Sequence, residues 1–306
     1  TYNITYNLGG GINSDVNPAA YDIVTPTIIL QLPTKTGYNF AGWWSTPFGG
    51  TQVAQIASGS TGDIILYALW TPKHNTAYKV EHYQQDVSGA SYTIKDTDNL
   101  AGATAATATA FARIYTGFTE NTAHGSRVAS GTIAGDGTLV LKLYYDRSTY
   151  DVSFNSNGGS AVYDTTGVRH GATISAPVAP TKTGYTFAGW YKDSGLTTEW
   201  DFALDTVTAN TTLYAKWTGN AYNVTFDGNY GGDLSTSNKS VPYGDIYGEL
   251  ATVSRTGYTF NGWFTEASGG TKIETGTTVN TANDHTLYAQ WTINTYNITY
   301  NLDGGT

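Results

Sequence analysis

The side chains of this 306-residue chain that could perform acid–base or metal chemistry are few and scattered. Histidine is best suited to proton transfer near neutral pH and to metal binding, but no two histidines stand at the spacing of a metal site. The five are His74, His82, His124, His170 and His285. No order of Ser, His and Asp recurs, so we interpret all five as surface or structural residues. We predict no catalytic residue, no metal ligand and no cofactor.

Three carboxylates near a glycine-rich turn could bring oxygen ligands around a calcium ion. They are Asp227, Asp233 and Asp245. Their spacing is not that of an EF-hand loop, which favours ordinary surface carboxylates. Bound calcium stays open, as does an internal lysine–asparagine crosslink, because one sequence does not mark the buried groups that a crosslink needs.

Aromatic rings offer a second kind of chemistry, since Trp and Tyr can stack on sugars. Three tryptophans recur in register with predicted strands: Trp43, Trp190 and Trp263. Burying a large side chain stabilises a fold by about 1.5 to 3 kcal/mol, so we predict that these three form cores. Trp44 and Trp200 are not shared by all copies of the pattern. Together with Tyr115 they are our candidate ligand contacts.

The recurring tryptophans belong to a phrase, Gly-Tyr-x-Phe-x-Gly-Trp, that occurs at 37–43, 184–190 and 257–263. The later copies lie roughly 73 residues apart, which is typical of a tandem array of small modules. Arrays usually build length and present surface. The predicted domains are module one (1–72), module two (73–148), module three (149–219), module four (220–293) and the first strand of a fifth module (294–306).

The composition limits the classes of partner. Lys and Arg number 15 against 24 Asp and Glu, for a net charge of −9, so the chain lacks the clustered cations that nucleic acids and anionic membranes require. No apolar run approaches about 18 residues, and no leader opens the sequence. We expect no membrane insertion by this segment, and any anchor to lie outside it. Cysteine is absent, so packing of 24 Tyr, 10 Phe and 8 Trp must hold the modules together.

Each module opens with alternating apolar residues, which predicts a strand with one buried face. Glycine-rich turns follow, as at Asn157-Gly158-Gly159. A second strand is predicted at Val162-Tyr163 in module three and at 241–244 in module four. Two prolines in 174–180 allow a short helix at most. The closing strand of module three is predicted at 211–217.

Module two keeps an opening strand at 78–83 and a closing strand at 139–145 but lacks the Gly-Trp phrase. Its centre, residues 102–111, alternates Ala and Thr. Alanine favours a helix there and threonine favours a strand, and the sequence does not decide between them.

The array resembles the Listeria–Bacteroides repeat, the B-repeat of internalin-type surface proteins. The resemblance rests on Tyr150-x-Val152-x-Phe154-x-x-Asn157-Gly158-Gly159, on 180–191 and on Leu213-Tyr214-Ala215-Lys216-Trp217. Module two, with residues 78–83 and 141–145, resembles a MucBP-like repeat. Module one departs at Gly9-Gly10-Gly11, and module four has Ser254-Arg255-Thr256 where the others have Thr-Lys-Thr. These departures concern loop contacts.

The resemblance implies a mainly β (α+β) fold of tandem β-grasp, ubiquitin-like modules arranged as an elongated rod. Such modules occur in large secreted or wall-anchored bacterial proteins. It implies a non-enzymatic stalk or spacer of a bacterial cell-surface adhesin, anchored to the cell wall through a region outside this sequence. The alternative is a set of glycan- or mucin-binding adhesin repeats. The expected partner is a protein or glycan of a host or neighbouring cell, and the strand at 295–302 could also mediate strand-swapped self-association.

Overall fold

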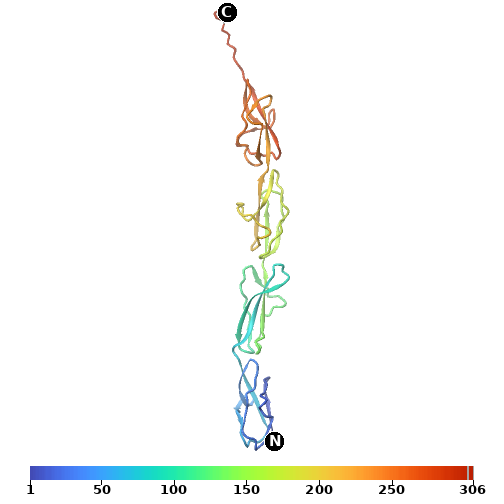
Figure 1. The fold of residues 1–306 in the computed structure, drawn as a ribbon, viewed down its shortest axis with the longest axis vertical. Helices are drawn as coiled ribbons and strands as arrows, with labels where there is room; N and C mark the ends of the chain where they lie inside the picture. The colour runs from blue at the N-terminus through green and yellow to red at the C-terminus, as the bar shows by residue number, and fades with distance from the viewer. Residues whose placement is uncertain (302, 306) are drawn as a thin grey trace. The chain divides into compact units, whose positions relative to one another are not determined.

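The computed structural model describes residues 1–301 and 303–305, and in these residues every regular element is a β-strand (Figure 1). This confirms the mainly β fold. The chain divides into two compact units, the first containing 1–149 with 169–171 and the second containing 150–168 with the residues from 172 onward. Leu302, the last residue of the predicted strand at 295–302, lies outside the described residues.

The first unit contains modules one and two. The main sheet of module one has the order β2-β1-β7-β4-β5, and β3 pairs with β6 beside it. These strands are β1 (Tyr2–Asn7), β2 (Ala20–Tyr21), β3 (Ile28–Ile29), β4 (Tyr38–Thr46), β5 (Gly49–Gln52), β6 (Gln55–Ile56) and β7 (Ile64–Pro72). The main sheet of module two has the order β11-β13-β8-β9, and β10 pairs with β12. Its strands are β8 (Thr76–Gln85), β9 (Tyr92–Gly102), β10 (Thr107–Thr109), β11 (Phe118–Glu120), β12 (Ser130–Thr132) and β13 (Val140–Arg147).

The second unit repeats this plan twice. Module three forms a sheet of order β15-β14-β17-β16. Its strands are β14 (Thr149–Asn155), β15 (Thr165–Arg169), β16 (Tyr185–Tyr191) and β17 (Thr211–Gly219). Module four forms a sheet of order β20-β18-β24-β22-β23, and β19 pairs with β21. Its strands are β18 (Ala221–Asp227), β19 (Asp233–Leu234), β20 (Asn238–Pro242), β21 (Val253–Ser254), β22 (Tyr258–Phe264), β23 (Lys272–Ile273) and β24 (His285–Ile293).

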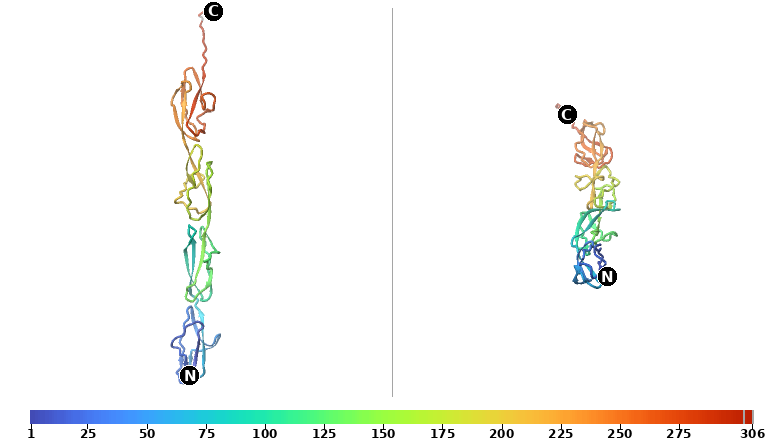
Figure 2. Two further views of the ribbon diagram at one scale, coloured as in Figure 1. Left: turned by 90° about the vertical axis from the view of Figure 1, so that its right-hand side faces the viewer. Right: turned by 60° about the horizontal axis from the view of Figure 1, so that its bottom comes forward.

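All four modules place their opening and closing strands side by side and parallel at the centre of the main sheet. Figure 2 shows the ribbon of the modules from two further sides. The intervening chain supplies the antiparallel neighbours. Four separate clusters of buried side chains result, each drawn from one predicted module. The domain boundaries themselves stay predictions.

A β-bulge turns the tryptophan of the Gly-Trp phrase into the core. In module three the pairing of β16 with β17 shifts register between Phe187 and Trp190. Gly189, inside the bulge, has φ 118°, which a side chain rarely allows. Trp190 is consequently only 2% exposed and packs edge-on to Phe187, with ring centroids 5.4 Å apart. Trp43 and Trp263 are equally buried behind Gly42 and Gly262, which confirms their assignment to the core.

The closing tryptophan explains the glycines of the opening turn. Trp217 donates its indole hydrogen to the carbonyl oxygen of Ser156 at 2.9 Å and lies across Gly159. A Cβ on Gly159 would stand 2.4 Å from the Trp217 ring, so only glycine fits there. Trp70 and Trp291 make the same hydrogen bond in modules one and four.

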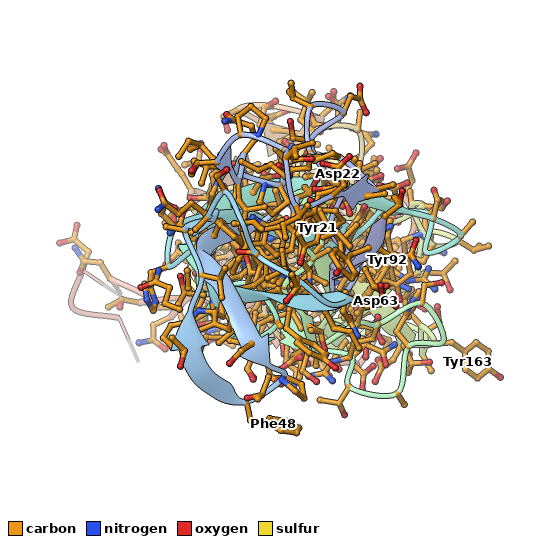
Figure 3. All side chains as sticks on the ribbon, turned by 90° about the horizontal axis from the view of Figure 1, so that it is seen from below. Tyr21, Asp22, Phe48, Asp63, Tyr92 and Tyr163 are labelled. Atoms are coloured by element: carbon orange, nitrogen blue, oxygen red, sulfur yellow. The ribbon has the colours of Figure 1, made fainter. Side chains whose placement is uncertain are left out.

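Several predicted elements differ from the structure. The second strand of module three is Thr165–Arg169, so its prediction at Val162-Tyr163 was wrong. Tyr163 is 96% exposed and projects from the surface (Figure 3), whereas Val168 is the buried residue of this edge. Residues 174–180 have no regular structure, and the Ala-Thr run contains a turn followed by strand β10. Residues 295–301 form no strand.

The equivalent tryptophans provide a matched stability test. Trp263 donates its indole hydrogen to the carbonyl oxygen of Ala251 at 2.8 Å, whereas the buried indole nitrogen of Trp190 has no hydrogen-bond partner among the described residues. Trp263→Phe should therefore lower the stability of module four by about 1 to 2 kcal/mol more than Trp190→Phe lowers that of module three. The reason is that only Trp263→Phe leaves a buried carbonyl oxygen without its hydrogen-bond donor. Amide hydrogen exchange in each module measures this difference.

The control is Phe48→Ala, since Phe48 is 99% exposed (Figure 3) and its loss should change stability by less than about 0.5 kcal/mol. Equal losses at Trp190 and Trp263 would contradict the hydrogen-bond argument.

Candidate functional site

The three candidate ligand contacts do not come together in one site. Trp44 lies half-buried on β4, Tyr115 precedes β11, and Trp200 belongs to the core of module three. Trp200 is 7% exposed, so a ligand at the surface would have little access to its ring. The three residues therefore remain separate positions in three different modules.

The carboxylates and histidines show no clustering that would hold a metal. Among the described residues, no group of three or more His, Asp or Glu side chains has that geometry. Asp227 instead accepts a hydrogen bond from the backbone N–H of Asn229 at 2.8 Å, which fixes the turn after β18. That contact gives Asp227 a structural role.

A buried histidine in module two anchors a polar network that the sequence did not indicate. His82 is fully buried on β8, with Nδ1 2.8 Å from the hydroxyl of Tyr145 and Nε2 3.1 Å from Asp98. The Tyr145 hydroxyl also accepts a hydrogen bond from the backbone N–H of Arg113 at 3.0 Å. The residues come from distant parts of the sequence, so spacing alone gave no signal for the network.

Tyr115 lies at the outer end of the same network. Its hydroxyl donates a hydrogen bond to Asp96 at 2.7 Å, and Arg113 forms ion pairs with Asp96, at 3.3 Å, and with Asp98. Burial, followed by the hydrogen bond to Asp96, raises the pKa of Tyr115. The same hydrogen bond is the main cause that lowers the pKa of Asp96. The polar groups named here are paired with one another, which indicates a structural role.

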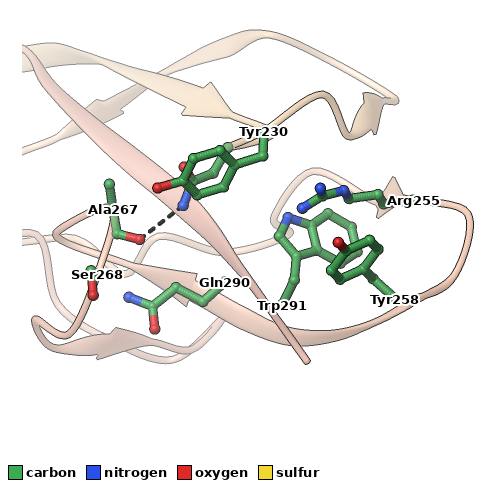
Figure 4. A pocket seen from close by; sticks show the side chains of 8 residues that line it. Tyr230, Arg255, Tyr258, Ala267, Ser268, Gln290 and Trp291 are labelled. Carbon is green, nitrogen blue, oxygen red and sulfur yellow. Dashed lines mark hydrogen bonds between the residues drawn. The ribbon is translucent and has the colours of Figure 1, made fainter. Parts of the chain in front are cut away.

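One opening in module four combines aromatic, amide and cationic groups (Figure 4). It is a surface cleft of about 410 Å³. Its lining residues are Asn229, Tyr230, Arg255, Tyr258, Ala267, Ser268, Gln290 and Trp291. None of them was among the candidate ligand contacts. The sequence feature that could have pointed to this cleft was the change from Thr-Lys-Thr to Ser254-Arg255-Thr256.

Backbone hydrogen bonds hold the amide side of this cleft. Asn229 donates from Nδ2 to the carbonyl oxygens of Ala267 at 2.8 Å, drawn in Figure 4, and of Ala289 at 2.9 Å. Gln290 donates from Nε2 to the carbonyl oxygens of Glu266 and Gly269. The loop after β22 is thereby tied to the turn after β18 and to β24, so the cleft has a defined wall.

The aromatic side of the cleft carries its cation. The Arg255 guanidinium carbon lies 3.7 Å from the ring centroid of Tyr258 and 5.9 Å from that of Tyr230. Figure 4 shows Arg255 beside the rings of Tyr258 and Trp291. This arrangement can bind a ligand that has both a negative charge and an apolar face.

The fold and these sites define a chain of small β modules, three of which are built around repeated tryptophans. The sequence model of the Listeria-Bacteroides repeat domain matches residues 2–69, 150–216 and 222–290, which is more than half of the chain. The chain therefore belongs to this family, as the sequence pattern predicted. The resemblance of module two to a MucBP-like repeat stays a prediction.

Similar proteins occur in Evansella cellulosilytica and Listeria monocytogenes. A protein of the former, provisionally described as a Gly-rich membrane protein, is 31% identical over 89% of this chain and 32% of its own length. A second, provisionally described as a membrane protein, is 38% identical over 55% of this chain and 24% of its own length. Internalin H of Listeria monocytogenes is 42% identical over 44% of this chain and 25% of its own length. The chain thus spans about a third or less of these relatives.

The described residues contain no helix long and apolar enough to cross a bilayer.

The network around Tyr115 predicts a specific pH effect. Tyr115→Phe removes the hydrogen bond that lowers the Asp96 pKa, so that pKa should rise toward its usual 3.8. A carboxylate with a lowered pKa stabilises the fold above its unfolded pKa, and this contribution is lost as pH falls through the folded value. Module two of the variant should therefore lose less stability in acid. A carbon NMR titration of the Asp96 carboxyl measures the change.

Tyr92→Phe is the matched control, because Tyr92 donates to Asp146 instead. An Asp96 pKa that is the same in the unmodified chain and in the Tyr115→Phe variant would show that the hydrogen bond does not set it.

Proposed function

We propose that this chain is a non-enzymatic segment of a bacterial cell-surface protein, and that its repeats act as a spacer for flanking parts of that protein. The proposal is supported by family membership and by the similarity to an internalin and to proteins described as membrane proteins. The single observation that carries the spacer role is how tightly neighbouring modules are joined within each unit.

In the first unit, one linker residue is hydrogen bonded on both sides. The backbone N–H of Lys73 donates to the carbonyl oxygen of Gly37 in module one at 2.9 Å, and the Lys73 carbonyl oxygen accepts from Thr104 in module two at 2.8 Å. Gly37 and Gly135 pack so closely that a Cβ on Gly37 would lie 2.4 Å from the Gly135 Cα. Reorienting either module would break these contacts.

The second unit repeats this joint with different side chains. The N–H of Asn220 donates to the carbonyl oxygen of Gly184 at 2.9 Å, and its own carbonyl oxygen accepts from Tyr243 at 2.8 Å. Tyr185 packs edge-on to Tyr243, with ring centroids 5.2 Å apart. A joint that satisfies backbone groups on both sides of one linker residue restricts bending, and a spacer needs that property.

Small-angle scattering on the whole chain tests the spacer role. Four modules in line, each about 30 Å long from the rise of its strands, would have a radius of gyration of roughly 35 Å. A compact chain of this length would have a radius of gyration of about 19 Å. Deletion of 149–219 should shorten the particle by about one module length, roughly 30 Å. A radius of gyration near that of the compact chain would contradict the spacer role.

A single added methyl group tests the joint. A Cβ on Gly219 would stand 2.3 Å from the carbonyl oxygen of Tyr243, so Gly219→Ala should separate modules three and four without touching either core. Nitrogen NMR relaxation should then report shorter and unequal rotational correlation times for the two modules.

Gly276→Ala is the matched control, because a Cβ on Gly276 meets open space. Unchanged correlation times in Gly219→Ala would argue against a stiff joint.

The second candidate function is a glycan-binding adhesin. The cleft of module four favours it, because that cleft combines aromatic rings with an arginine.

A further inference from the structure

We propose that the cleft of module four binds the carboxylate-bearing sugar of an acidic glycan, with Arg255 receiving the carboxylate and Tyr230 and Tyr258 lining the sugar's apolar face. The spacer role does not depend on this site. The proposal rests on a comparison of the same position in three repeats of one chain.

In modules one and three the residue equivalent to Arg255 is a lysine, and its ammonium group already donates a hydrogen bond to a backbone carbonyl oxygen. Lys35 donates to the carbonyl oxygen of Gly9 at 2.7 Å, and Lys182 donates to that of Asn157 at 3.0 Å. Each ammonium also lies over the tyrosine of its Gly-Tyr phrase, with Lys182 4.7 Å from the Tyr185 ring centroid. These lysines close the opening turn onto the sheet.

Module four changes the turn as well as the cation. Gly232 packs against Trp291 as Gly159 packs against Trp217, and Gly228 accepts the indole hydrogen as Ser156 does. The turn between these two positions has one residue more in module four than in module three. Tyr230 lies in the lengthened turn, with φ 67° and an exposure of 77%. The insertion therefore places an exposed ring beside Arg255.

Arg255 is held by stacking and not by hydrogen bonds. In the part of the chain that the structure describes, its guanidinium has neither an ion pair with a carboxylate nor a hydrogen bond to an acceptor. The Tyr258 ring at 3.7 Å supports it from one side. A planar guanidinium positioned in this way keeps its donors for a ligand, and the fork of donors fits a carboxylate through two parallel hydrogen bonds.

The other lining groups define the ligand class. None of the described residues that line the cleft is acidic, so a carboxylate meets no direct repulsion there, although the whole chain has a net charge of −9. Tyr230, Tyr258 and the half-buried Trp291 provide ring surface for the C–H face of a sugar. A uronic or sialic acid combines both features, whereas a neutral sugar would leave the guanidinium without its partner.

The test uses the whole 306-residue chain with methyl glucuronide, N-acetylneuraminic acid and, as the neutral counterpart, methyl glucoside. Binding is followed by amide NMR shifts. At least one acid should bind with a dissociation constant on the order of 1 mM, and the neutral sugar about tenfold more weakly. The shifted amides should be those of 229–231 and 255–258.

Two variants assign the site. Arg255→Lys restores the residue of the other repeats and should weaken binding of the acid about tenfold while keeping the charge. Tyr230→Gly should also weaken it, and glycine suits the positive φ at this position, so folding should be preserved. Lys182→Arg in module three is the matched control and should create no new binding, because that turn lacks the inserted residue.

Three results would overturn the proposal: no binding of either acid at roughly 20 mM, which is well above the expected constant; equal binding of methyl glucoside; or unchanged affinity in Arg255→Lys. None of them would affect the scattering test of the spacer role.

Discussion

Burial of the tryptophan after the bulged glycine is the interaction on which each of the three matched repeats depends. A small module removes a limited fraction of its surface from water, so it needs a few large buried side chains. The positive φ of Gly189 turns Trp190 inward in the middle of an otherwise alternating strand. The closing Trp217 then lies over Gly159 and fixes the opening turn. Two glycines and two indoles therefore fix the bulged strand and the opening turn of the module.

Module two shows what replaces that interaction when the Gly-Trp phrase is absent. Its core cluster is built from Val80, Ala108, Ile133 and Leu141, and contains no tryptophan. The fully buried His82 is instead tied into hydrogen bonds at both ring nitrogens. A satisfied buried network specifies one arrangement of strands, because any other would leave its polar groups unpaired. Different interiors thus support the same central pair of parallel strands.

The sequence could predict the features that repeat, and it could not predict those that depend on packing between distant segments or on a single insertion. The alternation of apolar and polar residues was enough to find the central strands. The recurring tryptophan of the Gly-Trp phrase was enough to find the cores of three modules. The edge strand β15 was misplaced because Val162-Tyr163 and Val168 offer similar local patterns, and only packing decides which valine is buried. The His82 network and the cleft join residues far apart in sequence, so neither had a spacing that could reveal it.

Position in the module decides where a repeat can acquire a new property at little cost in stability. Arg255 and Tyr230 lie on loops at the surface, and Trp263 remains 2% exposed, as in the other repeats. In module four an arginine replaces the lysine and one turn is longer. The module therefore lacks the side-chain hydrogen bond to a carbonyl oxygen that Lys182 makes in module three, but its buried rings stay in place. The joint between modules three and four is also unaffected, since its hydrogen bonds link Gly184, Asn220 and Tyr243. One repeat in an array can therefore differ in what it binds while it keeps the same core and the same kind of connection to its neighbour.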